Sequence, residues 1–319
     1  RTSYNTFNFH DIAFQLPLAR RLGLGFSLTP YSSVGYRVSA DEQSDDVWGN
    51  IGRVQYLYAG EGDLTEVKLG IGWEVVKRVS IGVAAQYYWG DIERTYQTVV
   101  SNNIVNGGSV NTVTGTDSYG ISRIKMQLGL QADLIQSERQ VLTLGATYDM
   151  GGNLRPSVNQ TVVNGDIYGT VVRSDTTRMA LKLPVQLGVG LYYQNAKIAA
   201  GVDYIYQNWE NNESPKSVPG AVNVAYKNTN TVKLGFEYTP NRMDIRNYLK
   251  RWSYRVGFRY GTYYQTFEGK TLSQYAVTAG FGMPVRFLGR SSIDFGVEFG
   301  QRGNDSPLRI DNRQIGLVR

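Results

Sequence analysis

The sequence predicts an all-β protein: a transmembrane, antiparallel, up-and-down β-barrel of about 14 strands, 13 of them visible in the 319 residues. Apolar and polar residues alternate with a period of two in many segments. Many of these runs last about 9–11 residues, the length that a tilted strand needs to cross a bilayer. Apolar residues at helical spacing do not occur over any comparable length. We therefore expect residues 1–319 to form a single barrel domain.

The predicted strands follow from this alternation. In the segment 291–300, for example, Ile, Phe, Val and Phe occupy the odd positions from 293 to 299, while Asp, Gly, Glu and Gly occupy the even ones. The thirteen predicted strands are 7–18, 22–39, 47–75, 79–97, 117–134, 140–151, 176–194, 198–208, 224–239, 252–265, 271–285, 291–301 and 309–319. Because a closed bacterial barrel has an even number of strands, we expect one further strand, which would precede residue 1.

The polar face of these strands favours a membrane barrel over a soluble sandwich, whose strands also alternate. It consists mainly of Gly, Ser, Thr and Gln, with few Lys. Small polar side chains suit a crowded barrel interior, and the apolar face would then contact lipid. The strands of a soluble sandwich are also shorter, at about 5–6 residues.

Five tryptophans give an independent indication. Each lies near the end of a predicted strand, where aromatic girdles form at the two membrane interfaces. Trp48, Trp89 and Trp209 are next to longer connections, and Trp73 and Trp252 are next to shorter ones. The alternative is that these are ordinary half-buried tryptophans.

The predicted connections alternate in length. Short connections lie near 19–21, 76–78, 135–139, 195–197 and 286–290, with an intermediate one at 240–250. Longer polar stretches lie at 40–46, 98–116, 152–175, 209–223, 265–270 and 302–308. Short turns on the periplasmic side and long loops outside are typical of outer-membrane barrels.

The composition argues against several other classes of protein. There is no cysteine, and His10 is the single histidine, which leaves little room for thiol or histidine chemistry and for metal clusters. Neither a nucleophile elbow nor a phosphate-binding loop occurs. The net charge of +6 comes from scattered residues rather than from a basic stripe. We therefore expect neither an enzyme nor a nucleic-acid-binding protein, and no cofactor.

Three stretches resemble the FadL-like outer-membrane transporters of hydrophobic compounds, the FadL/TodX type. The first is Phe-Ser-Leu-Thr-Pro-Tyr at 26–31, followed by Gly-Tyr at 35–36 and Trp-Gly at 48–49. The second is the segment 64–89. The third and most specific begins with Leu-Pro at 183–184 and continues through Asp203 to Trp209. Together they cover about two thirds of the chain.

The resemblance implies passive import of hydrophobic small molecules, such as long-chain fatty acids, across the outer membrane of a Gram-negative bacterium. Membrane lipids and lipopolysaccharide would then surround the barrel. The family also carries an N-terminal hatch in its lumen. No residues before the first predicted strand match it, so we expect the hatch to be absent from this chain.

In this family the third strand kinks inward and opens the wall to lipid, and counting one missing strand makes 22–39 the third. Thr29, Pro30 and Tyr31 are the candidate kink, because proline removes a ladder donor and the alternation breaks there. Pro30 could instead mark where the strand leaves the bilayer. In the next strand, Gly-Glu-Gly at 60–62 predicts a bulge.

Several charged residues are expected on the lumen face of the barrel, where opposite signs should pair across strands because unpaired charges are costly. These candidate lumen charges are Asp203, Lys233, Glu237, Arg255, Arg259, Asp294 and Glu298. Ion pairs that stabilise the wall are the favoured interpretation, and a polar conduit for small solutes is the alternative. A third possibility is a FadL-like barrel that does not transport and serves as an accessory or structural subunit of an outer-membrane assembly or secretion complex.

Overall fold

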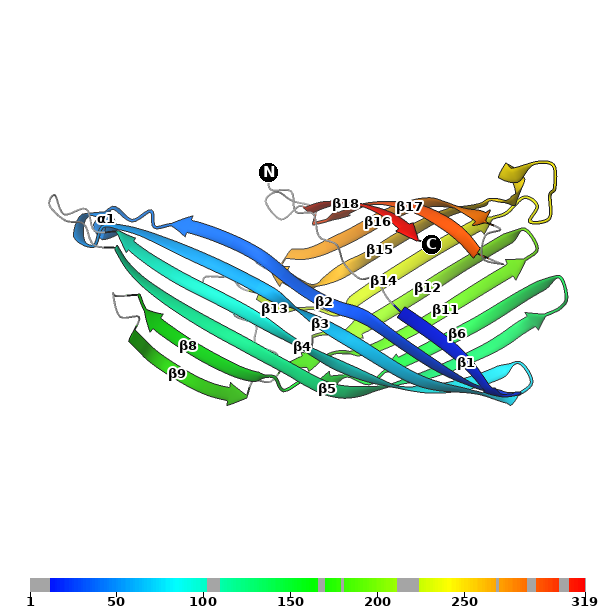
Figure 1. Cartoon of the computed structure of the whole chain (residues 1–319), viewed down its shortest axis with the longest axis horizontal. Coiled ribbons are helices and arrows are strands. Elements are labelled where there is room, and N and C mark those ends of the chain that lie inside the picture. Colours follow the sequence, from blue (N-terminus) through cyan, green and yellow to red (C-terminus); the bar gives the residue numbers. More distant parts are fainter. Residues whose placement is uncertain are drawn as a thin grey trace.

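The computed structural model describes residues 12–101, 110–165, 170–178, 181–210, 224–267, 270–285, 291–303 and 310–318. Nearly all of these residues lie in strands (Figure 1). The two helical segments are α1 (Asp45–Asn50) and the 3-10 turn η1 (Tyr248–Arg251). Within the described residues, no helix combines the length and the apolar character needed to span a membrane. His10 and the predicted connection 286–290 lie outside the described residues.

The strands pair in sequence order into one antiparallel sheet with a main path of thirteen strands. Along that path they are β1 (Ile12–Ala19), β2 (Leu22–Asp41), β3 (Arg53–Val76), β4 (Val79–Ser101), β5 (Val110–Gln136), β6 (Gln140–Asp149), β11 (Val185–Asn195), β12 (Ile198–Asn208), β14 (Thr229–Tyr238), β15 (Ser253–Phe267), β16 (Lys270–Val285), β17 (Ser291–Arg302) and β18 (Ile310–Val318). This confirms the predicted all-β, up-and-down fold.

The sheet curls about the long axis of the molecule, with the short connections gathered at one end (Figure 1, right). Strands β1 and β18 are the two ends of the pairing path among the described residues. Because thirteen antiparallel strands are an odd number, β1 and β18 run in the same direction. The predicted fourteenth strand stays a prediction.

The two faces of the sheet differ as the alternation predicts. On β3, Leu69, Ile71 and Trp73 point outward and are about half exposed, between 47% and 50%. The inward positions between them carry Gly70 and Gly72. A row of glycines crosses four strands on this inward face, formed by the consecutive cross-strand partners Gly23, Gly72, Gly82 and Gly129. The outer face is therefore apolar, and the inner face keeps the lumen open.

Strands β2 to β5 extend far beyond the rest of the sheet (Figure 1, left). Beside β5 the wall continues with β8 (Ser157–Asn164), which pairs with β5, and with β9 (Thr170–Arg178), which pairs with β8. The short strands β7 (Gly152–Asn153) and β10 (Lys182–Leu183) form a separate two-stranded sheet. A further short strand, β13 (Val224–Tyr226), pairs with β15. We refer to the distal parts of β2–β5 with α1, β8 and β9 as the extension.

Three of the predicted strand boundaries are wrong in the extension. The stretches 98–116 and 152–175 were expected as loops but are strand wherever they are regular, because their Val and Thr residues suit a strand that pairs with a long neighbour. Residues 47–50, expected as strand, belong to α1. The predicted bulge at 60–62 is also wrong, because β3 pairs with β2 and β4 there without any shift of register.

Candidate functional site

The lumen side of the wall contains large cavities. One of about 850 Å³ is lined by β3–β6, β11 and β12, and another of about 770 Å³ by β11, β12 and β14–β17. Both are lined by many glycines, which leave the backbone bare on the inner face. Their volumes lie within the range of small-molecule sites, about 300–1,000 Å³.

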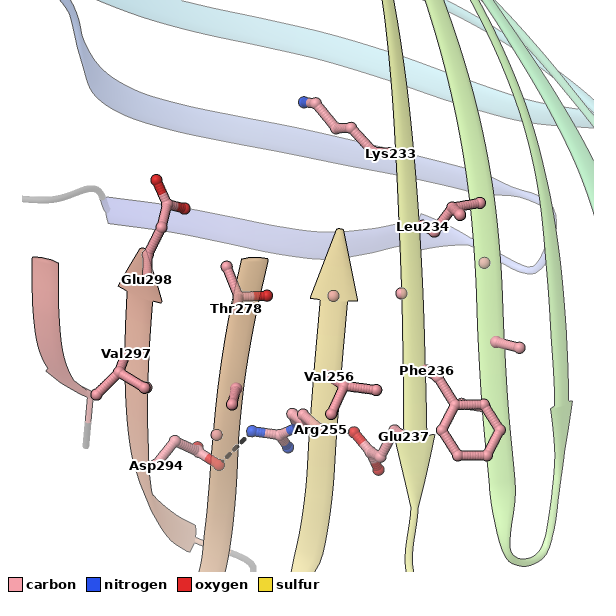
Figure 2. Close-up of a pocket in the computed structure, with 18 of the residues that line it drawn as sticks. Lys233, Leu234, Phe236, Glu237, Arg255, Val256, Thr278, Asp294, Val297 and Glu298 are labelled. Carbon is pink, nitrogen blue, oxygen red and sulfur yellow. Dashed lines mark hydrogen bonds and ion pairs between the residues drawn. The ribbon is translucent and has the colours of Figure 1, made fainter. Parts of the chain in front are cut away.

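Three predicted lumen charges form one network in the second cavity. Arg255 lies between two carboxylates, with Nε 2.8 Å from Glu237 Oε2 and Nη1 2.5 Å from Asp294 Oδ1 (Figure 2). Arg242 also reaches Glu237, with Nη2 3.4 Å from Oε1. The network links β14, β15 and β17 on the inside of the wall.

Strand β16 permits these contacts because its inward side chains are small. Arg255 and Asp294 are on β15 and β17, which are not neighbours, so the pair crosses β16 at Gly282. A second pair crosses the same strand, with Arg259 Nη2 3.0 Å from Glu298 Oε1. These two pairs hold together three strands that carry little other side-chain bulk on their inner face.

Lys233 and Asp203 are direct cross-strand partners on β14 and β12, yet no ion pair joins them. Figure 2 shows Lys233 apart from the Arg255 network and pointing away from it. Lys233 also has Arg259 as its cross-strand partner on β15. Within the described residues, Lys233 therefore makes no ion pair, although Asp203 lies opposite it on β12.

The candidate kink coincides with a break in register. The pairing of β2 with β3 shifts between Pro30 and Ser32, so that Tyr31 is the extra residue of a bulge. The structure thus places the candidate kink Thr29–Tyr31 at an irregularity in the pairing of β2 with β3.

Two glycines with positive φ lie at nearly the same level on neighbouring strands. Gly62 on β3 has φ 128° and Gly90 on β4 has φ 151°, values that favour glycine strongly. A Cβ on Gly62 would collide with the carbonyl oxygen of Asp91, and one on Gly90 with that of Asp63. Strands β3 and β4 therefore approach each other too closely for side chains at these two positions, near the bulge of β2 at Tyr31.

An apolar cluster occupies the lumen at this level, and we call it the mouth cluster. It consists of Leu64, Tyr88, Ile121 and Leu154, which are all buried. Leu154 comes from the segment between β6 and β8. The backbone N–H of Leu154 donates to the carbonyl of Leu181 at 2.7 Å. Tyr31 packs edge-on against Tyr88, with 4.8 Å between ring centroids. The mouth cluster and the candidate kink are therefore one contiguous site.

Sequence reasoning missed the mouth cluster. Leu154 lies in a stretch that was expected to be a polar loop, and the only signal was the Leu-Arg-Pro tripeptide at 154–156, where an apolar residue and a proline interrupt the polar composition. Leu64, Tyr88 and Ile121 lie on the inward side of the strands, where the alternation predicts polar or small residues. Three large inward apolar residues on adjacent strands at one height would have indicated a pocket.

A polar layer lies beside the mouth cluster. The buried carboxylate of Asp149 accepts hydrogen bonds from Gln86 at 3.0 Å and from Gln186 at 3.2 Å. Lys125 lies with its Nζ 5.5 Å from the centroid of the Tyr88 ring, and Lys68 pairs with Glu66 at 3.5 Å. In the described part of the chain, no group of three or more acidic or histidine side chains is arranged to hold a metal ion.

The five tryptophans occupy different environments. Trp73, Trp89 and Trp252 lie on the wall, where Trp89 stacks with Tyr87 and Trp252 with Phe281. Trp209 stacks on Tyr264 with 4.4 Å between centroids. Trp48 lies in α1 at the tip of the extension, with its Nε1 donating to the Glu42 carbonyl at 2.7 Å. Trp48 therefore lies apart from the three tryptophans on the wall.

Comparison with solved structures shows the fold that this wall forms. The monoaromatic hydrocarbon channel CymD matches with a TM-score of 0.58 at 14% identity, covering 96% of this chain and 80% of that one. The toluene transporter TodX of Pseudomonas putida matches with a TM-score of 0.53 at 15% identity and the same coverage. At these identities the comparison establishes a shared channel fold.

Comparison with protein families gives a match over nearly the whole sequence. The profile of the family described as BamG matches residues 1–314. No curated protein gives a significant match. The profile therefore covers every strand of the wall described above, apart from the end of β18.

Proposed function

The chain belongs to the BamG family, and we propose that it is an outer-membrane β-barrel of a Gram-negative bacterium through which hydrophobic small molecules enter passively. The observation that carries this proposal is the mouth cluster. A buried apolar site inside a barrel lumen binds apolar solutes and disfavours ions. The fold likeness to two hydrocarbon channels supports the same class of solute.

The route that we propose starts at the mouth cluster and leaves through the wall at Thr29–Tyr31. Tyr31 contacts Tyr88 of the mouth cluster, so movement of one ring changes the space beside the other. Pro30 has no N–H to donate to a neighbouring strand, and the bulge at Tyr31 interrupts the pairing of β2 with β3. An apolar solute could pass there into the lipid without crossing the polar layer below.

A long-chain fatty acid is the solute class that fits the lumen best. Its chain requires an apolar site, which the mouth cluster provides, and its carboxylate requires a cation. Lys233 is such a cation, without an ion-pair partner in the described part of the chain, and it lines a cavity of about 770 Å³. Arg255, which lines the same cavity, and Arg259 on the same strand are already paired with carboxylates. Neither chemical conversion nor a cofactor is part of this proposal.

The test is uptake of radiolabelled oleate by Gram-negative cells that lack their own fatty-acid transporter. Cells that produce this protein should take up oleate faster than cells with an empty vector. Uptake of a hydrophilic solute of similar mass should be the same in both strains. Equal oleate uptake in the two strains, with no fatty acid found in the purified protein by mass spectrometry, would contradict the proposal.

A second candidate function is that of an accessory subunit in an outer-membrane assembly. The family name BamG points to such a context. The extension supports it independently, because it exposes large apolar side chains beyond the wall, among them Val38 and Ile51, which are 54% and 48% exposed. Exposed apolar surface of this kind often marks a contact with another protein.

The two candidates differ in what accompanies the protein. Purification from native membranes in mild detergent should yield a stoichiometric set of partners if the chain is an accessory subunit. Replacing Trp48 and Ile51 together by Ser should then release those partners, whereas Trp73→Ser on the wall should not. A protein that purifies alone and binds oleate would favour transport.

A further inference from the structure

A groove of about 500 Å³ lies on the outer face of β14–β17, near the end of the sheet that carries the short connections. Its rim is a single register row of aromatic residues, Tyr238, Tyr254, Phe281 and Phe295. In the next row Ala279 forms the floor, because its side chain is too short to fill the space between its larger neighbours. The groove opens on the face that the alternation assigns to lipid.

The aromatic rim is firmly packed. Phe281 stacks on Phe295 with 5.3 Å between ring centroids, and Trp252 stacks on Phe281 at 5.1 Å. Side chains that support one another in this way keep an apolar slot open. In a bilayer such a slot is filled by an acyl chain, since water has no hydrogen-bonding partner in it.

The turn between β14 and β15 (residues 239–252) is fixed to the edge of this groove. The hydroxyl of Tyr254 donates to the Leu249 carbonyl at 3.1 Å, and that of Tyr248 donates to the Pro284 carbonyl at 2.8 Å. The Asp244 carboxylate accepts the backbone N–H groups of Arg246 and Asn247 at 2.9 and 2.8 Å. The N–H of Asn247, more than that of Arg246, holds the pKa of Asp244 below its usual value.

The surface of this turn is both apolar and basic. Met243 and Ile245 are 88% and 90% exposed. Arg246 makes no ion pair within the described residues, and Arg251 lies with its guanidinium 5.0 Å from the centroid of the Tyr248 ring. Apolar tips beside guanidinium groups match an anionic membrane surface, and a guanidinium binds phosphate through paired hydrogen bonds.

We propose that this groove and turn together bind one anionic glycerophospholipid. The phosphate lies against Arg246 and Arg251, and one acyl chain lies in the groove over Ala279. Two features select this occupant over a protein partner: the charge complementarity with the two arginines, and the continuity of the groove with the lipid-facing side of the wall. The site requires only that the barrel is in a bilayer, so it does not depend on whether solutes are transported.

The experiment is native mass spectrometry of the full chain in detergent, titrated with phosphatidylglycerol or with phosphatidylcholine. We expect the wild type to retain phosphatidylglycerol more tightly than phosphatidylcholine. The double variant Arg246→Gln/Arg251→Gln should lose about tenfold in phosphatidylglycerol affinity, since hydrogen bonds to charged groups are removed, and change little with phosphatidylcholine. The double variant Arg20→Gln/Lys77→Gln removes the same charge from two other short turns and should bind as the wild type does.

Filling the groove tests the acyl-chain part separately. Ala279→Phe should weaken the binding of both lipids. Ala279→Leu is the milder replacement if the first variant fails to show the heat-modifiable mobility of a folded barrel. Unchanged phosphatidylglycerol affinity in the Arg246/Arg251 variant would overturn the proposal. So would a variant that keeps its lipid affinity but loses a co-purifying periplasmic protein, because the turn would then be a protein-docking site. Lipid binding and oleate uptake are measured separately, so the two proposals can fail independently. A variant that loses lipid binding but takes up oleate normally, or one that binds lipid but does not take up oleate, separates this proposal from the transport proposal.

Discussion

Gly282 and Asp294 lie directly opposite each other on β16 and β17, and a Cβ on Gly282 would collide with the Asp294 carboxylate. The same Cβ would come within 3.3 Å of Arg255 Nη2. Gly282 is therefore the position that lets Arg255 reach across β16. The ion-pair network and this glycine form one structural unit on the lumen face.

Gly282→Ala should destabilise the barrel by about 1 kcal/mol, because it displaces a partly exposed ion pair. The matched control is Gly296→Ala on the neighbouring strand, where an added Cβ meets nothing within 4 Å. That control should be neutral or slightly stabilising, since alanine loses less backbone entropy than glycine does. Urea unfolding in detergent micelles measures both variants. Equal effects of the two substitutions would show that the network does not depend on Gly282.

Leu154→Ala should destabilise the segment between β6 and β8 by roughly 2–4 kcal/mol, because Leu154 is only 2% exposed within the mouth cluster. The truncation also leaves a gap in the lumen. We expect faster hydrogen exchange in residues 150–156 and a higher single-channel conductance than in the wild type. Leu134→Ala, at an outward position that is 53% exposed, is the control and should leave the conductance unchanged. Wild-type conductance in the Leu154 variant would mean that this cluster does not restrict the lumen.

Much of this architecture could be predicted from period-two alternation. Each side of a strand is committed to one environment, so residues such as Leu69 and Ile71 identify the outer face and the register follows. All thirteen strands of the main path were predicted. In the extension, most of β2–β5 was predicted too, whereas α1, β8, β9 and the ends of β4 and β5 were not, because the composition at 98–116 and 152–175 favours loops.

The candidate site was only partly predictable. Pro30 gives a local signal, because proline cannot donate to a strand ladder. The mouth cluster depends on Leu154 folding back into the lumen, for which the Leu-Arg-Pro tripeptide at 154–156 is the one local signal. Gly62 was expected to be part of a bulge at 60–62, since sequence alone cannot distinguish a glycine that shifts register from one that adopts a positive φ, and the matching positive φ at Gly90 was not predicted.

Lys233→Gln should weaken binding of a fatty-acid anion to the purified protein by about threefold to tenfold, because it removes a lumen cation that has no ion-pair partner among the described residues. Displacement of a fluorescent fatty acid measures the affinity. Lys197→Gln, which removes one charge from an exposed short turn, should have no effect. Asp203→Asn should strengthen binding of the fatty-acid anion, since Asp203 is the cross-strand partner of Lys233. If Lys233→Gln binds as the wild type does, the carboxylate lies elsewhere.

Pro30→Val should reduce oleate uptake several-fold without unfolding the barrel. Valine restores the N–H that proline lacks, and it favours the regular extended strand that the bulge at Tyr31 interrupts. A straightened β2 would draw Tyr31 away from Tyr88 and close the proposed exit beside the mouth cluster. Pro17→Val on β1 is the control, since it makes the same replacement in a described strand far from the kink. Heat-modifiable mobility in both variants would show that they fold. Undiminished uptake in the Pro30 variant would mean that the bulge only marks the place where β2 leaves the wall and enters the extension.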